Sequence, residues 1–182
     1  MNIDKPLAAI PQQSVEERAR TRVNAHDWLE SGTEAQKEAA ARLIAALDAQ
    51  NATEADALYE RLSGLPVARR VVEAFSARPM TDNERKIIQA LLINPGSTTT
   101  ELSRACGYGD NKIWQMHFGN LCKDRQAYLW PAEKFEKRDA LFFSGILADV
   151  EVPSMRFTLK AEVAAAFTEL GLSAPRAAAP MS

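Results

Sequence analysis

Two stretches in the second half of the chain carry polar and basic side chains of the types that contact nucleic acid. Asn111 and Gln115 stand about one helical turn apart, and amides placed in this way pair with the edge of an adenine. Lys112 can reach a guanine or a phosphate, and cations in a later extended stretch suit backbone phosphates. The complete set of predicted DNA contacts is Asn111, Lys112, Gln115, Lys123, Arg125, Arg156 and Lys160.

A second group of reactive residue types, Cys106, His117 and Cys122, offers metal ligands or a nucleophile with a base. The spacing Cys-x10-His-x4-Cys matches no zinc pattern, and nothing in the sequence orients a Cys–His pair or supplies an oxyanion hole. The chain also lacks a glycine-rich phosphate loop and a Ser-His-Asp order. We therefore predict no catalytic residue, no metal and no cofactor, and a protein that is not an enzyme.

The predicted contacts must be positioned by the elements between Thr81 and Leu170. A helix over 81–93 precedes a Thr98–Glu101 capping box, which starts a short helix, and the glycines of GYG (107–109) then turn the chain. A longer helix should run from Asn111 to about Tyr128, with Trp114, Phe118 and Leu121 as its buried stripe. A β-hairpin over 141–160 and a last helix over 161–170 follow.

This order predicts a helix-turn-helix followed by a wing. In such a unit the second helix enters the major groove with its N-terminal turns against the bases. The helix from Asn111 would therefore read duplex DNA, and the hairpin would hold phosphates. Gly119 inside that helix costs stability, and we interpret it as a place where another segment approaches closely.

The first part of the chain is rich in alanine and predicts four amphipathic helices joined by short turns. Their expected ranges are 15–29, 33–47, 53–62 and 66–75. The fold class is therefore mainly α, an N-terminal helical bundle plus a C-terminal winged-helix-like domain with one β-hairpin. The predicted divisions are a flexible arm at 1–13, the bundle at 14–78, the winged-helix-like domain at 79–171 and a disordered tail at 172–182.

Net charge and hydropathy limit the classes of partner that the protein can bind. Twenty-two Lys and Arg against 24 Asp and Glu give a net charge of −2, which argues against a strongly basic protein that coats DNA nonspecifically and against a polybasic membrane binder. No apolar run reaches the roughly 18–20 residues of a spanning helix, and the first residues lack signal-peptide features, so we expect a cytoplasmic protein. The alanine stripes also favour a homodimer through the N-terminal helices.

Three short motifs, ELSRACGY, the stretch from His117 to Leu121 and RFTLKAEVAAAF, carry a resemblance. They are similar to a winged-helix module that stands beside HNH-nuclease or ASCH-type domains in bacterial proteins. The resemblance covers about half of the chain and implies a role in bacterial DNA handling or defence. No HNH nuclease signature is present, so it implies no nuclease activity.

Two functions remain open from the sequence. The first is DNA binding in a bacterial regulatory or defence-related system. The alternative is a protein-binding adaptor or inhibitor, of the kind that mobile elements encode, which docks on a bacterial complex without catalysis. The balanced charge and the apolar hairpin favour the alternative, because DNA binders need cations that neutralise phosphates.

Overall fold

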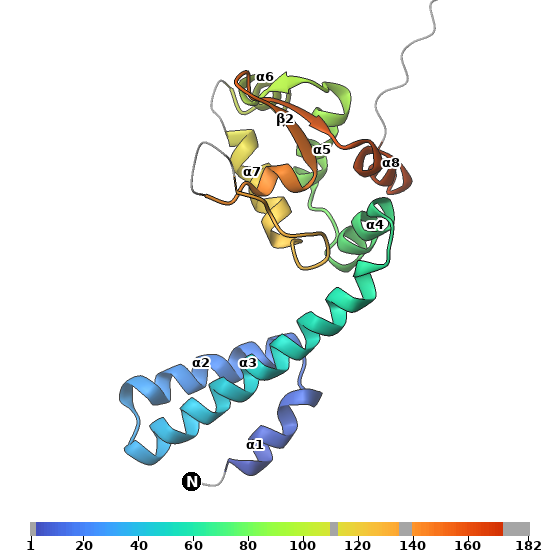
Figure 1. The fold of residues 1–182 in the computed structure, drawn as a ribbon. Coiled ribbons are helices and arrows are strands. Elements are labelled where there is room, and N and C mark those ends of the chain that lie inside the picture. The colour runs from blue at the N-terminus through green and yellow to red at the C-terminus, as the bar shows by residue number, and fades with distance from the viewer. Residues whose placement is uncertain (1–2, 110–112, 135–139, 173–182) are drawn as a thin grey trace, which may run out of the picture. The chain divides into compact units, whose positions relative to one another are not determined.

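A computed structural model describes residues 3–109, 113–134 and 140–172, and Figure 1 shows its fold. The predicted class is confirmed, since the protein is mainly helical with one small antiparallel sheet in its C-terminal part. The chain divides into two compact units, Met1–Glu60 and Arg61–Ser182. Within the described ranges, no helix combines the length and the apolar character that crossing a bilayer requires.

The described residues of the first unit form helices: α1 (Asp4–Ala9), the 3-10 turn η1 (Ile10–Gln12), α2 (Val15–Ser31) and most of α3 (Glu34–Ser63). Ser14 and Glu17 form the expected capping box at the start of α2. A small core fills the space between the helices, and Arg18 of α2 lies 2.6 Å from the Glu54 carboxylate of α3. Residues 4–12 are therefore mostly helical, where the sequence predicted an extended arm.

The second and third predicted helices are in fact the single helix α3. We expected Thr53 to begin a new helix, because its hydroxyl can cap one. The hydroxyl instead donates to the carbonyl of Ala49 at 3.0 Å, one turn back in the same helix. A threonine bonded in this way stays inside a helix, so the chain continues without a break.

Nine further elements follow in chain order among the described residues of the second unit. They are α4 (Val67–Ala77), α5 (Asp82–Ile93), β1 (Ser97–Thr98), α6 (Thr99–Ala105), α7 (Ile113–Asp124), the 3-10 turn η2 (Phe143–Ile146), β2 (Ala148–Glu151), β3 (Arg156–Leu159) and α8 (Ala161–Glu169). The capping boxes Thr81–Glu84 and Thr98–Glu101 start α5 and α6, the second of them as the sequence predicted.

The three strands form an antiparallel sheet in the order β1-β3-β2. The predicted hairpin exists, but its first strand begins at Ala148 and not at Leu141. The residues between form η2, because Gly145 turns the chain and donates its N–H to the Phe142 carbonyl at 3.1 Å. The apolar residues of η2 therefore pack on α7 and are not part of a strand.

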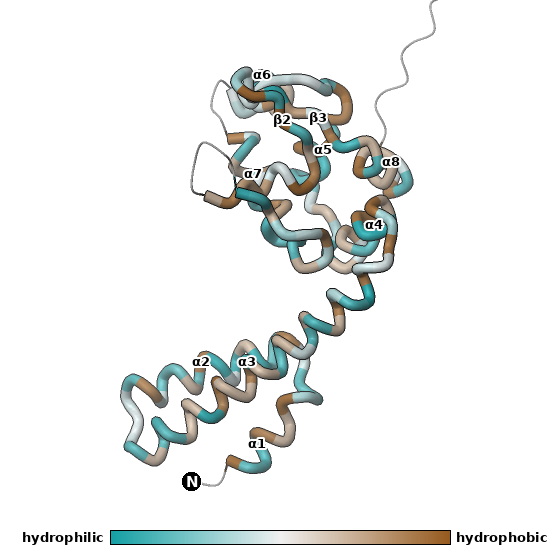
Figure 2. The backbone as a smooth tube through the Cα atoms, in the orientation of Figure 1, coloured by the Kyte–Doolittle hydropathy of each residue, from teal (hydrophilic) through white to brown (hydrophobic). Residues whose placement is uncertain are grey.

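The core of the second unit is built on the stripe that the sequence predicted, since Trp114, Phe118 and Leu121 of α7 are all buried. The Trp114 ring stacks on Phe118 at 4.8 Å and meets the edge of Phe157 on β3 at 5.2 Å. Its indole N–H donates to the Ile87 carbonyl of α5. Figure 2 shows hydrophobic residues recurring along the helices and strands that surround this core.

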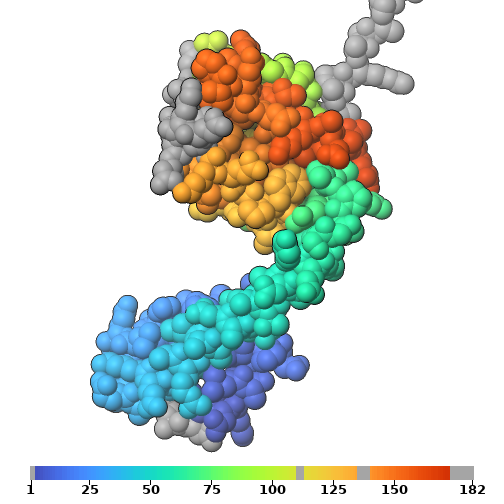
Figure 3. Space-filling view, in the orientation of Figure 1, coloured from blue at the N-terminus to red at the C-terminus, as the bar shows by residue number. Residues whose placement is uncertain are grey.

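Helix α4 belongs to the second unit, although the sequence placed it in the N-terminal bundle. It packs side by side with α8 (Figure 1, Figure 3), and Phe75 meets Phe167 with ring centroids 5.0 Å apart. The apolar face of α4, which includes Val71 and Ala74, is buried there. An amphipathic pattern identifies such a face but not the helix that covers it.

Replacing Gly119 by alanine tests whether this glycine is needed for close packing in α7. A Cβ at this position would lie 3.6 Å from the Ser144 hydroxyl, which is ordinary contact, so close approach does not require the glycine. Alanine loses less backbone entropy in a helix, and we expect Gly119→Ala to raise the free energy of unfolding by about 0.5–1 kcal/mol. Urea denaturation followed by circular dichroism measures this, and a destabilised variant would show a tighter contact than the structure has.

Candidate nucleic-acid interface

The structure places the predicted α7 contacts in different surroundings. Asn111 and Lys112 lie outside the described residues. Gln115 is half-buried in a shallow depression between α7 and the segment 141–144. Lys123 is exposed, and its ammonium lies 5.7 Å from the centre of the Phe143 ring. Gln115 and Lys123 therefore both adjoin the segment 141–144, and of these two side chains only Lys123 is exposed.

Arg125 is buried, although the sequence predicted that it contacts DNA. Its side chain is 0% exposed, and its guanidinium lies 2.8 Å from the Glu84 carboxylate of α5. It also donates to the carbonyls of Arg78 and Leu121, and stands 4.4 Å from the centre of the Phe75 ring. With its donors used inside the protein, Arg125 cannot contact a phosphate, so that prediction was wrong.

The two cations of the hairpin lie at opposite ends of β3. Arg156 donates to the Gly96 carbonyl at 2.8 Å and lies 3.6 Å from the Glu101 carboxylate, so its charge is partly compensated. Lys160, just beyond the strand, holds its ammonium 5.6 Å from the centre of the Trp130 ring. The hairpin therefore does not present the two cations as one row for a phosphate backbone.

A polar cluster that the sequence analysis missed surrounds Tyr108, in the turn between α6 and α7. The Lys86 ammonium lies 5.5 Å from the centre of the Tyr108 ring, and the His117 ring centre lies 5.6 Å from it. The Tyr108 hydroxyl is hydrogen bonded to the Asn83 side chain. Arg104 is exposed in the last turn of α6. We call Lys86, Arg104, Tyr108 and His117 the turn cluster.

The turn cluster depends on backbone geometry that glycine provides. Gly107 and Gly109, on either side of Tyr108, have φ angles of +72° and +70°. A side chain at either position would be strained, because L residues rarely adopt this region. The GYG motif was therefore a usable signal for the turn, whereas the approach of α5 was not visible from local sequence.

The outward face of α7 is only weakly charged. Met116 is 56% exposed, Asn120 is exposed one turn later, and Lys123 follows. Leu141, 51% exposed, borders the same depression beside α7. Bulky apolar groups on a surface often mark a contact with another macromolecule.

Comparisons with protein-family models, with curated proteins and with solved structures found no match.

The cysteines do not have the environment of a nucleophile. Burial raises the pKa of the Cys106 thiol, and the nearby Lys86 charge offsets only part of this effect. Burial also raises the pKa of the Cys122 thiol. Both thiols remain protonated at neutral pH, whereas a reactive cysteine is a thiolate. In the parts of the chain that the structure describes, no three His, Cys, Asp or Glu side chains group closely enough to hold a metal ion.

Removing Arg125 should destabilise the second unit strongly. Arg125→Ala leaves the mostly buried Glu84 carboxylate without its cation, which costs about 3–5 kcal/mol for a buried pair. The matched control is Arg78→Ala, which breaks an exposed ion pair with Asp124 and should cost less than about 1 kcal/mol. Urea denaturation separates the two variants, and equal losses would contradict the structural role of Arg125.

Glu84 should make stability depend on pH. Burial alone raises its pKa, but hydrogen bonds from Arg125 and Thr81 and the Arg125 charge outweigh this, so the pKa lies below its ordinary 4.5. A lowered pKa contributes stability that is present above the unfolded-state value and is lost as the pH falls through the folded-state value. The stability difference between wild type and Glu84→Gln should therefore be full at pH values well above 4.5 and shrink as the pH falls below 4.5. Denaturation curves across this range test the prediction, which fails if the difference stays constant.

Proposed function

We propose that Arg61–Ser182 is a winged-helix module that binds duplex DNA in a bacterial regulatory or defence-related system. The order α5-β1-α6-α7-β2-β3, with the sheet order β1-β3-β2, supports this, because it is the order of a winged helix. In that arrangement α7 takes the position of the recognition helix. The resemblance of the turn and closing-strand motifs to bacterial winged-helix modules points in the same direction.

The observation that carries the proposal is the turn cluster. Lys86 of α5 and His117 of α7 lie against the Tyr108 ring, and Arg104 is exposed in the last turn of α6, four residues before Tyr108. The turn of a helix-turn-helix and the start of its second helix lie against the DNA backbone, where cations and hydroxyl groups contact phosphates. The interface thus consists of this cluster together with the outward face of α7.

The residues proposed to contact DNA differ from those that the sequence predicted. Arg125 is excluded because it is buried, and the turn cluster and Asn120 are added. Asn111, Lys112 and Gln115 remain candidates for base contacts, and Lys123 remains a candidate for phosphate. Arg156 and Lys160 become less suitable, since one bridges β3 to α6 and the other lies over Trp130.

A second candidate function, docking on a protein, is favoured by the apolar character of the same face. Met116 and Leu141 are both more than half exposed beside α7. Several arginines of the second unit are paired with carboxylates, Arg156 with Glu101 and Arg78 with Asp124 among them, so their charges are partly neutralised before any DNA approaches. An adaptor or inhibitor would use Met116 as an anchor.

The test is binding of a labelled random-sequence duplex to the full chain, measured by fluorescence anisotropy at several salt concentrations. Binding should weaken steeply as salt rises, because the cations that neutralise phosphates release counterions. The double variant Lys86→Ala/Arg104→Ala should lower the slope of log K against log salt by about 1 for each phosphate that the protein no longer neutralises.

Arg69→Ala is the matched control. Arg69 is an exposed cation on α4, paired with Glu169 of α8, and its removal changes the net charge without touching the turn cluster. It should leave the salt slope unchanged. An equal effect of Arg69→Ala, or no binding of wild type at low salt, contradicts the proposal and turns attention to protein docking through Met116.

A further inference from the structure

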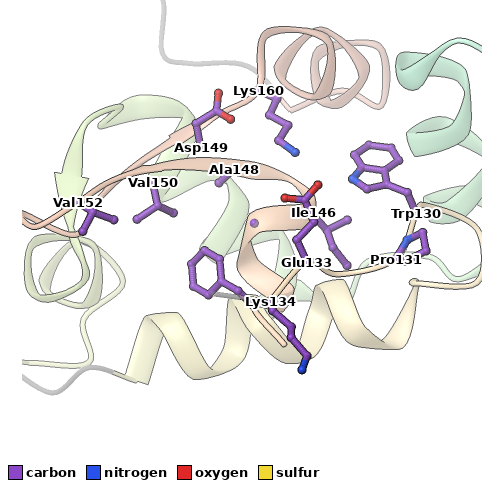
Figure 4. A pocket seen from close by; sticks show the side chains of 12 residues that line it. Trp130, Pro131, Glu133, Lys134, Ile146, Ala148, Asp149, Val150, Val152 and Lys160 are labelled. Atoms are coloured by element: carbon purple, nitrogen blue, oxygen red, sulfur yellow. The ribbon is translucent and has the colours of Figure 1, made fainter. Parts of the chain in front are cut away.

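A pocket of about 290 Å³ opens in the second unit, between the chain that follows α7 and strand β2 (Figure 4). Residues of the segments 130–134, 142–146 and 148–152 line it, together with Lys160. Gly145 and Ala148 are among the lining residues, and their small size leaves the space open. Ligand pockets in proteins begin at about 300 Å³, so this one suits a small molecule.

One side of the pocket is apolar. Phe142, Ile146 and Val150 line it, and Ile146 is almost fully buried. Val150 lies opposite the buried Phe157 in the ladder, so it is on the face of the sheet that covers the core. An apolar group placed here leaves water, which is favourable.

Four charged residues line the pocket, but only two of them face its interior. Neighbouring residues of a strand point to opposite faces, so the Asp149 side chain is on the other face of β2 from Val150, and Figure 4 shows it directed away. The exposed side chain of Lys134 also points away from the pocket (Figure 4). The Lys160 ammonium and the Glu133 carboxylate, in contrast, are directed toward the same part of the pocket (Figure 4).

The charges of Lys160 and Glu133 remain available to a ligand. Both residues belong to the described part of the chain, and no ion pair joins them. The Lys160 ammonium lies 5.6 Å from the centre of the Trp130 ring, and the Arg70 guanidinium lies 5.9 Å from the same centre. The Trp130 end of the pocket is therefore positive beside the negative Glu133. A ligand with a single charge would pair with one of the two residues and bring a like charge to the other.

We propose that this pocket binds a free α-amino acid with an apolar side chain. Its carboxylate pairs with Lys160 and its ammonium with Glu133, because an α-amino acid carries both groups on one carbon. The apolar side chain extends along Phe142 and Val150, and Figure 4 shows Val150 on the side of the pocket away from Trp130. The pocket shares no residue with the turn cluster, so the inference does not rest on DNA binding.

The probe is L-phenylalanine, titrated into the full chain by isothermal titration calorimetry. 3-Phenylpropionate lacks the ammonium and 2-phenylethylamine lacks the carboxylate, so each loses one ion pair and should bind about fivefold more weakly. Lys160→Gln should weaken phenylalanine binding and abolish the preference over phenylethylamine. Glu133→Gln should abolish the preference over phenylpropionate.

Arg156→Gln is the matched control, since it removes a cation of β3 that does not line the pocket and should leave phenylalanine affinity unchanged. Amide shifts of wild type give a readout that needs no variant, because those of Gly145 and Val150 should move as phenylalanine saturates the pocket. Absence of saturable binding, equal affinity for the three ligands, unmoved shifts at both positions, or equal affinities of Lys160→Gln and Arg156→Gln would each overturn the proposal.

Discussion

The buried ion pair between Arg125 and Glu84 determines how the second unit is assembled. The Arg125 guanidinium at the end of α7 bonds to the Glu84 carboxylate in the first turn of α5, and to the Arg78 carbonyl after α4. The same carboxylate accepts the N–H of Thr81, so one group both caps α5 and holds α7. Such a pair contributes little net stability when compared with apolar residues, but it is costly to break and therefore favours one arrangement of the three helices.

With the end of α7 held there, the other side of the helix is constrained as well. Trp114 and Phe118 occupy the core between α5 and β3, and η2 packs along the Gly119 side. What remains for a partner is the face of Met116 and Asn120, together with the turn cluster.

Local signals in the sequence predicted the parts of this fold that depend on local chemistry. The capping boxes at Ser14 and Thr98 and the buried stripe of α7 are confirmed, because each depends on residues within one or two turns. The errors concern long-range partners. Nothing near Arg125 in the sequence shows that Glu84 approaches it, just as nothing near Tyr108 shows that Lys86 does. The sequence also predicted a strand in the apolar run before Ala148, which in fact forms the 3-10 turn η2. A short apolar run is compatible with either structure, so its composition alone does not distinguish them.

DNA binding through the α6–α7 turn is best tested by nuclear magnetic resonance mapping of the full chain with a short random-sequence duplex. Amide shifts should change at Tyr108, His117 and Asn120, whereas α4 and α8 should stay unperturbed. Perturbations confined to α4 and α8, or none at any salt concentration, would contradict DNA binding through the α6–α7 turn.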